Sequence, residues 1–144
     1  MAINFYASVK VKTPAKTKIR KWLFFIATSE KKKIKTLVYN FCSDEELLKI
    51  NKQFLKHDTY TDIITFDYSE KDLISGEIYI SIERVAANSL KEKVSFEEEL
   101  TRVMAHGLLH LCGYKDKTIT DKKSMRKAEN KALQLFKKPL GINE

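Results

Sequence analysis

Twelve consecutive residues, Val103 to Tyr114, include no Asp, Glu, Lys or Arg, although 32% of the chain is charged. They continue a predicted helix whose start is marked by Ser95 and Glu98, which have the spacing of a capping box. A helix that is apolar around its whole circumference has to be covered by other elements on every side. Gly113 is the residue type best suited to end it in a left-handed conformation. The sequence therefore predicts that this helix, residues 95–112, is buried nearly all round.

The segments around this helix alternate between the periodicity of strands and that of helices. Thr13 and Pro14 are typical of a helix start, and apolar residues follow them at helical spacing. We expect strands at 3–11, 33–41, 61–68 and 77–82, and further helices at 14–28, 43–56, 83–92 and from about Thr120 onward. This order predicts an α+β fold in which residues 1–144 form a single domain, with one mixed sheet of about four strands packed with about five helices.

Composition narrows the class of protein. No uncharged run reaches the roughly 18 residues of a membrane-spanning helix, and the first residues lack the basic and apolar regions of a secretion signal. The chain has two cysteines, Cys42 and Cys112, which suit a reducing compartment better than a disulfide-stabilised fold. We therefore expect a cytoplasmic protein without a membrane partner.

Charge is distributed unevenly along the chain. The total is +8, with +9 in residues 1–35, −7 in residues 36–100 and +6 in residues 101–144. Two basic ends around an acidic middle favour a polyanionic partner such as nucleic acid. Only four of the 27 basic residues are arginine, however, and a lysine-rich surface is also explained by solubility alone.

Two histidines in the central helix form the clearest candidate site. His106 and His110 are four residues apart, so their imidazoles lie on the same helix face and can share one metal ion. After the helix-ending Gly113 the chain can fold back, which brings Asp116 toward the pair. Two histidines, one carboxylate and an open position for water are a ligand set of catalytic zinc. The alternative is that both histidines are polar residues satisfied by other partners within a buried helix.

Three nearby residues are less suited to bind the metal. Cys112 lies about 160° around the helix from His110 and is expected to pack in the core. His57 follows a predicted helix and precedes a strand, as a surface loop residue does. Asp121 stands at the start of the last helix and fits the third ligand position less well than Asp116.

The segment that carries the histidines is similar to a known family signature. HGLLHLCGYKD, at residues 106–116, resembles H-G-x-L-H-L-x-G-Y-D-H, the signature of the YbeY family of bacterial endoribonucleases. The matching residues are His106, Gly107, Leu109, His110, Leu111, Gly113 and Tyr114. YTDIITFDY at 60–68 resembles the family's P-T-D-V-L-S-F segment through Thr61, Asp62 and Phe66, and ISGEIYIS at 74–81 resembles its L-G-D-I segment.

This resemblance implies a small single-domain α+β protein with one zinc ion in a cleft. It also implies a role in ribosomal RNA maturation, notably at the 3′ end of the small-subunit RNA, and in ribosome quality control. The family's three histidine ligands correspond to His106, His110 and, in place of the third histidine, Asp116. Carboxylate also binds zinc, although its charge should reduce the Lewis acidity of the metal. The family's Arg before the T-D segment is replaced by Leu55, so another basic residue would have to contact phosphate.

We expect the chain to be a metal-dependent endoribonuclease that cleaves single-stranded RNA with a metal-activated water, with RNA and the ribosome as partners and no DNA. Thr61, Asp62 and Thr65 are candidate substrate contacts, and their alternative role is to stabilise the sheet and its turns. No general base is identified, since Gly107 stands where zinc peptidases of the H-E-x-x-H type have Glu. Two other functions stay open: a non-catalytic ribosome-assembly factor with a structural metal, and a zinc peptidase.

Overall fold

Helix α4 (Phe96–Leu111) is buried along most of its length in the computed structural model, which describes residues 1–56 and 60–138. The hydroxyl of Ser95 accepts a hydrogen bond from the Glu98 amide and so caps the first turn. The buried residues of α4 are Glu99, Leu100, Thr101, Val103, Met104, Ala105, Gly107, Leu108, Leu109 and Leu111. The burial predicted from the uncharged run is thus confirmed, although His110 is exposed and His106 is only half-buried.

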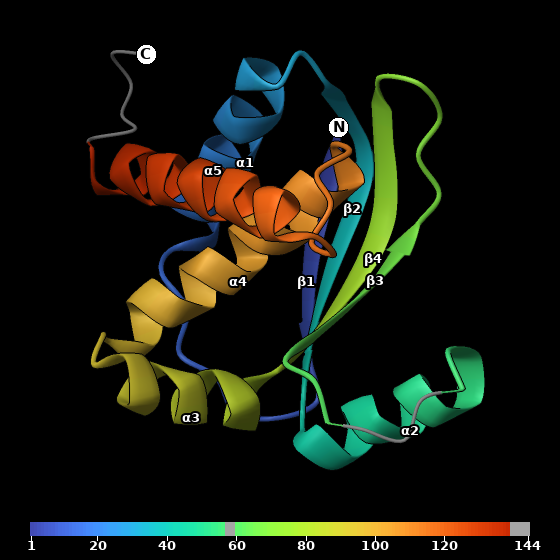
Figure 1. Ribbon diagram of the computed structural model, residues 1–144, viewed down its shortest axis with the longest axis vertical. Helices are drawn as coiled ribbons and strands as arrows, with labels where there is room; N and C mark the ends of the chain where they lie inside the picture. Colours follow the sequence, from blue (N-terminus) through green and yellow to red (C-terminus); the bar gives the residue numbers. More distant parts are fainter. Residues whose placement is uncertain (57–59, 139–144) are drawn as a thin grey trace.

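The remaining elements build a mixed sheet with helices around it (Figure 1). In chain order they are β1 (Ala2–Ala7), α1 (Lys16–Ser29), β2 (Lys33–Cys42), α2 (Asp44–Phe54), β3 (Ile63–Asp67), β4 (Leu73–Ser81), α3 (Ile82–Glu92), α4 and α5 (Ile119–Lys137). The strands lie in the order β1-β2-β4-β3, with β1, β2 and β4 parallel and β3 antiparallel to β4. The predicted α+β class, with four strands and five helices in the described part of the chain, is confirmed.

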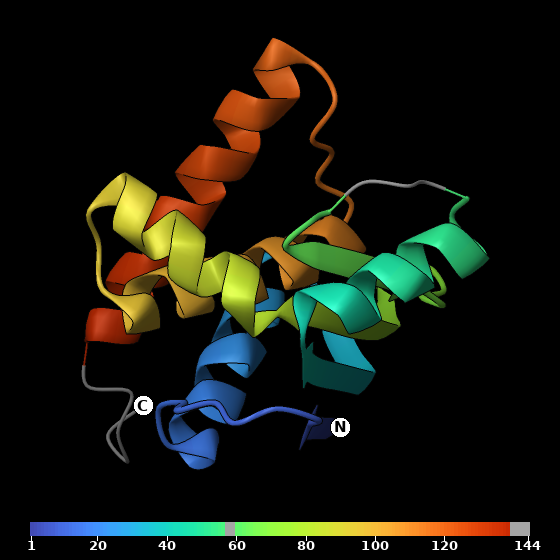
Figure 2. The same ribbon diagram turned by 90° about the horizontal axis from the view of Figure 1, so that it is seen from below.

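The sheet separates two layers of unequal size. Helices α1, α3, α4 and α5 gather on one face, and α2 lies on the other, away from α5 in both views (Figures 1 and 2). The main core fills the space between α1, α4 and the sheet, where the Tyr39 hydroxyl of β2 donates a hydrogen bond of 2.8 Å to the carbonyl oxygen of Met104. A smaller cluster, Cys42, Leu47 and Ile64, lies under α2. The larger layer is the one that carries the predicted metal ligands.

Helix α5 packs along α4 and is also joined to α1. The Trp22 indole donates a 2.8 Å hydrogen bond to the carbonyl oxygen of Ala132, and its ring packs edge-on against Phe136 with 4.9 Å between ring centroids. Both aromatic side chains are buried. This contact fixes α5 across α4. Among the described residues, no helix is long and apolar enough to cross a membrane.

Two of the predicted strand boundaries are wrong. The first strand ends at Ala7 rather than at residue 11, because Ala7 pairs with Phe41, next to the last residue of β2, and the described residues form no strand that could pair with it beyond that point. The fourth strand begins at Leu73 rather than at residue 77, because Ser75 and Gly76 already pair with β2. Pairing with the neighbouring strand, which local sequence does not reveal, sets both ends.

The start of the first helix also differs from the prediction. Helix α1 begins at Lys16 with Ala15 as its N-cap, and no side chain caps it, so Thr13 is not the capping residue. The predicted capping box of α2 is present, since Ser43 and Glu46 exchange hydrogen bonds. The other helices lie within about two residues of their predicted bounds.

Gly113 ends the central helix in the conformation that only glycine adopts easily. Its φ is +110°, and a Cβ atom at this position would meet nothing within 4 Å, so only backbone strain opposes a side chain. We expect Gly113→Ala to lower the free energy of unfolding by about 1–2 kcal/mol, measured by urea denaturation followed by circular dichroism. An unchanged midpoint would show that this turn does not require glycine.

Candidate metal centre

A cleft of about 530 Å³ lies between α4, the start of α5 and the segment that leads into β3. We call it the α4–α5 cleft. It is lined by Thr61, Asp62, Ile63, Glu99, Arg102, Val103, His106, Asp116, Lys122, Met125, Arg126 and Glu129. A cleft is thus present at the predicted helix, and it contains His106 and Asp116 of the three predicted metal ligands.

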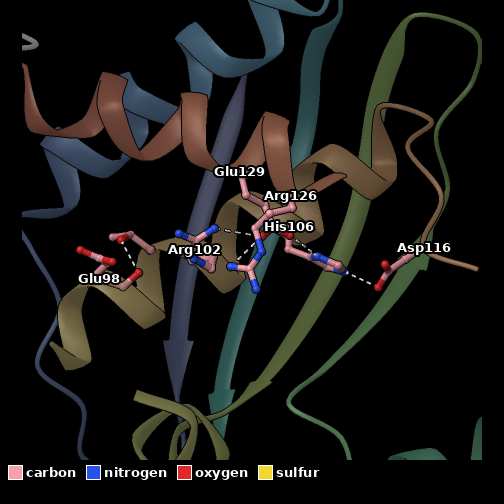
Figure 3. Close-up of polar contacts among 7 residues, drawn as sticks. Glu98, Arg102, His106, Asp116, Arg126 and Glu129 are labelled. Atoms are coloured by element: carbon pink, nitrogen blue, oxygen red, sulfur yellow. Dashed lines mark hydrogen bonds and ion pairs between the residues drawn. The ribbon is translucent and has the colours of Figure 1, made fainter. Parts of the chain in front are cut away.

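His106 is held between two carboxylates, one from α5 and one from the segment after α4 (Figure 3). Its Nδ1 lies 2.7 Å from Glu129 Oε2, and its Nε2 lies 3.8 Å from Asp116 Oδ2. In the neutral ring, Nδ1 must carry the proton that it donates to Glu129, so the lone pair of Nε2 points toward Asp116. This is the ring orientation that a metal-binding histidine takes when a carboxylate supports its other nitrogen.

The charges around His106 also change its basicity. Burial alone would lower the pKa of His106, but the hydrogen bond and charge of Glu129, together with the charges of Asp116 and Asp62, outweigh it and raise the pKa above the ordinary value. The carboxylates therefore create a site that attracts positive charge, whether a proton or a metal cation.

The donor chemistry of this pair fits a metal ion. Two ligands of one tetrahedral zinc ion, each about 2.0–2.2 Å from the metal, lie about 3.4 Å apart. The separation of His106 Nε2 and Asp116 Oδ2, 3.8 Å, is close to that value. Imidazole nitrogen and carboxylate oxygen are both common ligands of zinc. A metal ion between these two atoms would need little rearrangement of the pair.

His110 is not gathered into the same cluster. It lies one turn beyond His106 on α4, but its side chain is exposed and is absent from the cleft lining. Within residues 1–56 and 60–138, no three His, Cys, Asp or Glu side chains stand close enough together to hold a metal ion. The structure therefore brings together two of the three predicted metal ligands, His106 and Asp116. The assignment of His110 as the third ligand stays a prediction.

The predicted substrate contacts fall into two groups. Thr61 and Asp62 line the cleft, whereas Thr65 lies within β3, opposite Ile78 of β4, and is not part of the cleft lining. Burial raises the pKa of Asp62, although the positive charge of His106 opposes this shift. Asp62 thus adds a carboxyl group that faces the histidine from the side of the sheet, and the geometry of Thr65 favours its alternative role in the sheet.

Glu129 and Arg102 belong to the candidate site but were missed by the sequence prediction. Glu129 is only 6% exposed, and its Oε1 also accepts a 3.2 Å hydrogen bond from Arg102 of α4 (Figure 3). One signal was available, because Glu129 lies in the apolar stripe of α5 between Met125 and Ala132. A charged residue in a buried stripe requires a partner, but the sequence does not say which residue provides it.

The cleft contains cationic side chains, although Leu55 stands where the family has an arginine. Leu55, which stands at that position, follows the end of α2 and is 42% exposed. Arg102 and Arg126 instead reach the cleft from α4 and α5, and Lys122 lines it as well. Arg126 Nη1 is 3.9 Å from Glu129 Oε1, while the Arg126 side chain stays 56% exposed and accessible to a substrate.

Two further positions agree with the sequence interpretation. Cys112 packs against the core, and burial raises the pKa of its thiol to about 12, so it is not the thiolate that a metal would need. At Gly107, a Cβ atom would lie 2.8 Å from Ile78 Cδ1, so this position faces the sheet. A peptidase-type Glu at Gly107 would therefore collide with the Ile78 and Ile63 side chains of the sheet unless they shifted. His57 lies outside the described residues.

Comparisons with known proteins identify the family. The family model described as Endoribonuclease YbeY matches residues 3–137. Endoribonuclease YbeY of Flavobacterium psychrophilum is 49% identical over 134 residues, which is 93% of this chain and 96% of the relative. Endoribonuclease YbeY of Cytophaga hutchinsonii is 54% identical over 123 residues, which is 85% of this chain and 86% of the relative.

A solved structure supports the same assignment. The solution structure of TM1509 from Thermotoga maritima matches with a TM-score of 0.68 and 28% identity, and the match covers 93% of this chain and 88% of that one. Together with the cleft, these matches define a hydrolytic nuclease that cleaves RNA. The chain belongs to the endoribonuclease YbeY family. The non-catalytic and peptidase alternatives are therefore not favoured.

The hydrogen bond between Glu129 and His106 can be tested by measuring zinc affinity, without measuring RNA cleavage. We expect Glu129→Gln, which keeps the shape of the side chain but removes its charge, to weaken Zn²⁺ binding by about 10- to 100-fold. The dissociation constant is measured by competition with a chromophoric chelator. Glu98→Gln, which removes an α4 carboxylate outside the cleft lining, serves as the control and should leave the constant unchanged. Equal affinities for both variants would contradict the role given to Glu129.

Proposed function

We propose that this endoribonuclease cleaves single-stranded RNA in the α4–α5 cleft with the help of one zinc ion. We further propose that it acts in ribosomal RNA maturation, at the 3′ end of the small-subunit RNA, and in ribosome quality control. The observation that carries the proposal is the orientation of His106, whose Nδ1 is held by a buried carboxylate while Nε2 faces Asp116. A histidine held in this way is prepared to bind a metal.

In this proposal His106, His110 and Asp116 hold the zinc ion. When bound, zinc supplies Lewis acidity at the phosphate and lowers the pKa of water toward 7. Glu129 keeps His106 in the tautomer that leaves Nε2 free, and Arg102 in turn keeps Glu129 in place. Asp116 is exposed, as suits a ligand at the mouth of a cleft that a polymer must enter.

The same cleft provides contacts for the RNA backbone. Arg126 and Lys122 project from the exposed side of α5 at the cleft, and we assign them to the phosphates next to the cleaved bond. They take the place of the arginine that the family has at the position of Leu55. Thr61 and Asp62 approach the substrate from the opposite wall of the cleft. Both cysteines are free, which is consistent with the cytoplasm as the place of action.

The catalytic assignment predicts a specific loss of RNA cleavage. We expect His106→Ala and Asp116→Ala to reduce cleavage of a single-stranded ribosomal RNA fragment by at least about 100-fold and to lower the zinc content measured by elemental analysis. Asp72→Ala is the matched control, because it removes an exposed carboxylate that pairs with Lys32 far from the cleft. Single-stranded DNA of the same sequence and unfolded casein should stay intact.

Other outcomes would assign the site differently. Unchanged zinc content in Asp116→Ala would remove this residue from the ligand set. If His110→Ala loses the metal, stays folded and still supports ribosome maturation, the metal has a structural role. Cleavage of casein with intact RNA would favour the peptidase instead.

The phosphate contact predicts an effect on substrate binding rather than on the metal. We expect Arg126→Ala to raise the KM for single-stranded RNA about tenfold with unchanged zinc content, because a charge-assisted hydrogen bond is lost. Lys123→Ala removes a neighbouring charge of α5 that does not line the cleft, and it should have a much smaller effect. The KM should also rise steeply with salt concentration. If the KM is unchanged both in Arg126→Ala and at high salt concentration, the proposed contact of Arg126 with the RNA backbone is contradicted.

A further inference from the structure

Helix α5 borders a second cavity on the side opposite the α4–α5 cleft. This cavity, of about 820 Å³, lies between α1 and α5, and we call it the α1–α5 groove. Its lining residues are Phe25, Ile26, Thr28, Ser29, Glu30, Leu109, Tyr114, Ser124, Lys127, Ala128, Lys131, Ala132, Gln134, Leu135 and Lys138. None of these residues lines the α4–α5 cleft, so the endoribonuclease site does not account for the groove.

The floor and the edge of the groove differ in chemistry. The floor is apolar and is formed by Ile26 of α1, Leu109 of α4, and Ala128, Ala132 and Leu135 of α5. Ala128, Ala132 and Leu135 recur at helical spacing, so they form one continuous stripe along α5. Ile26, Leu109 and Ala132 are themselves buried, whereas Ala128 and Leu135 are half-buried and present apolar surface that a ligand could cover.

The edge along α5 is positively charged. Lys127, Lys131 and Lys138 are exposed and line the groove, and the first two are four residues apart on the same side of the helix. The acidic residue that lines the groove in the described part of the chain is Glu30, and its carboxylate accepts a 3.2 Å hydrogen bond from the Tyr114 hydroxyl. The groove thus combines an aliphatic floor with a row of lysines on one edge.

We propose that the α1–α5 groove binds an amphipathic, acidic α-helix of a partner protein. The apolar face of such a helix would cover the stripe of Ala128, Ala132 and Leu135, and its Glu or Asp side chains would pair with Lys127 and Lys131. The part of α5 from Ser124 to Leu135 spans about 16 Å, which corresponds to about three turns of a bound helix. Phe25 and Tyr114 also line the groove, but its floor is aliphatic and offers no partner to a phosphate, so burial of the floor favours the apolar face of a protein helix over RNA.

The position of the groove would allow the partner and the RNA to bind at the same time. Lys122, Arg126 and Glu129 line the α4–α5 cleft, whereas Lys127, Ala128 and Lys131 line the groove, so two faces of α5 serve two surfaces. The proposal goes beyond the endoribonuclease function, and its main test measures peptide binding rather than RNA cleavage. Failure of one proposal is therefore distinguishable from failure of the other.

The test uses a synthetic helix as the probe. A fluorescein-labelled peptide of about 16 residues, composed of Glu, Leu and Ala in an amphipathic helical pattern, is titrated with the full chain, and fluorescence anisotropy reports binding. We expect Lys127→Glu/Lys131→Glu to weaken binding at least tenfold. The matched control is Lys16→Glu/Lys21→Glu, which changes the net charge equally on the exposed side of α1, outside the groove, and it should change the affinity less than twofold.

Two measurements separate the effects of charge and of apolar contact. A peptide with Lys in place of Glu should not bind, and Ala128→Glu should weaken binding of the acidic peptide by a similar factor while the protein stays folded. Absence of binding, or equal weakening by both double variants, would overturn the proposal. So would a groove variant that weakens single-stranded RNA binding more than peptide binding, or concentration-dependent self-association that the groove variants abolish.

Discussion

The hydrogen bond between Glu129 and His106 is the contact on which the functional arrangement depends. It joins α5 to α4, with 2.7 Å between Glu129 Oε2 and His106 Nδ1, and the same carboxylate accepts a second hydrogen bond from Arg102. A buried carboxylate is costly unless charged or hydrogen-bonded partners surround it, and here both partners come from α4, one turn apart. A single buried acid thereby orients the imidazole of His106 and the guanidinium of Arg102 in the same cleft.

The place of Glu129 depends in turn on how α5 is attached to the core. Trp22 of α1 holds α5 through the Ala132 carbonyl and the Phe136 ring, and Tyr39 of β2 holds α4 through the Met104 carbonyl. Both hydrogen bonds are buried, so water does not compete for them. The site therefore takes its geometry from the main core, and His106 lies on the side of α4 that faces the cleft.

Sequence patterns predicted those features of the fold that depend on interactions between residues close together in the chain. The burial of α4 follows from an uncharged run, its start from Ser95, and its end from Gly113, each of which lies within or next to the helix. The approach of Asp116 to His106 was also predicted, because the chain has to turn back after Gly113.

The residues that the sequence did not reveal are those placed by distant partners. Glu129 follows His106 by 23 residues and lies on a separate helix, so their contact depends on the packing of α5. The first strand ends where its partner β2 ends, which no residue near Ala7 indicates. The same-face rule for His106 and His110 gave their relation to each other, but it did not show that His110 is exposed and lies outside the cleft lining.

The most direct test of this account is the tautomer of His106 in the metal-free protein. Long-range ¹H–¹⁵N NMR spectra of protein labelled with ¹⁵N-histidine, recorded at a pH where the ring is neutral, distinguish the two nitrogens, and His106→Gln assigns the signals. We predict that the proton resides on Nδ1, that Nε2 is unprotonated, and that Glu129→Gln reduces this preference. A proton on Nε2, or the same mixture of tautomers with and without the Glu129 carboxylate, would contradict the account.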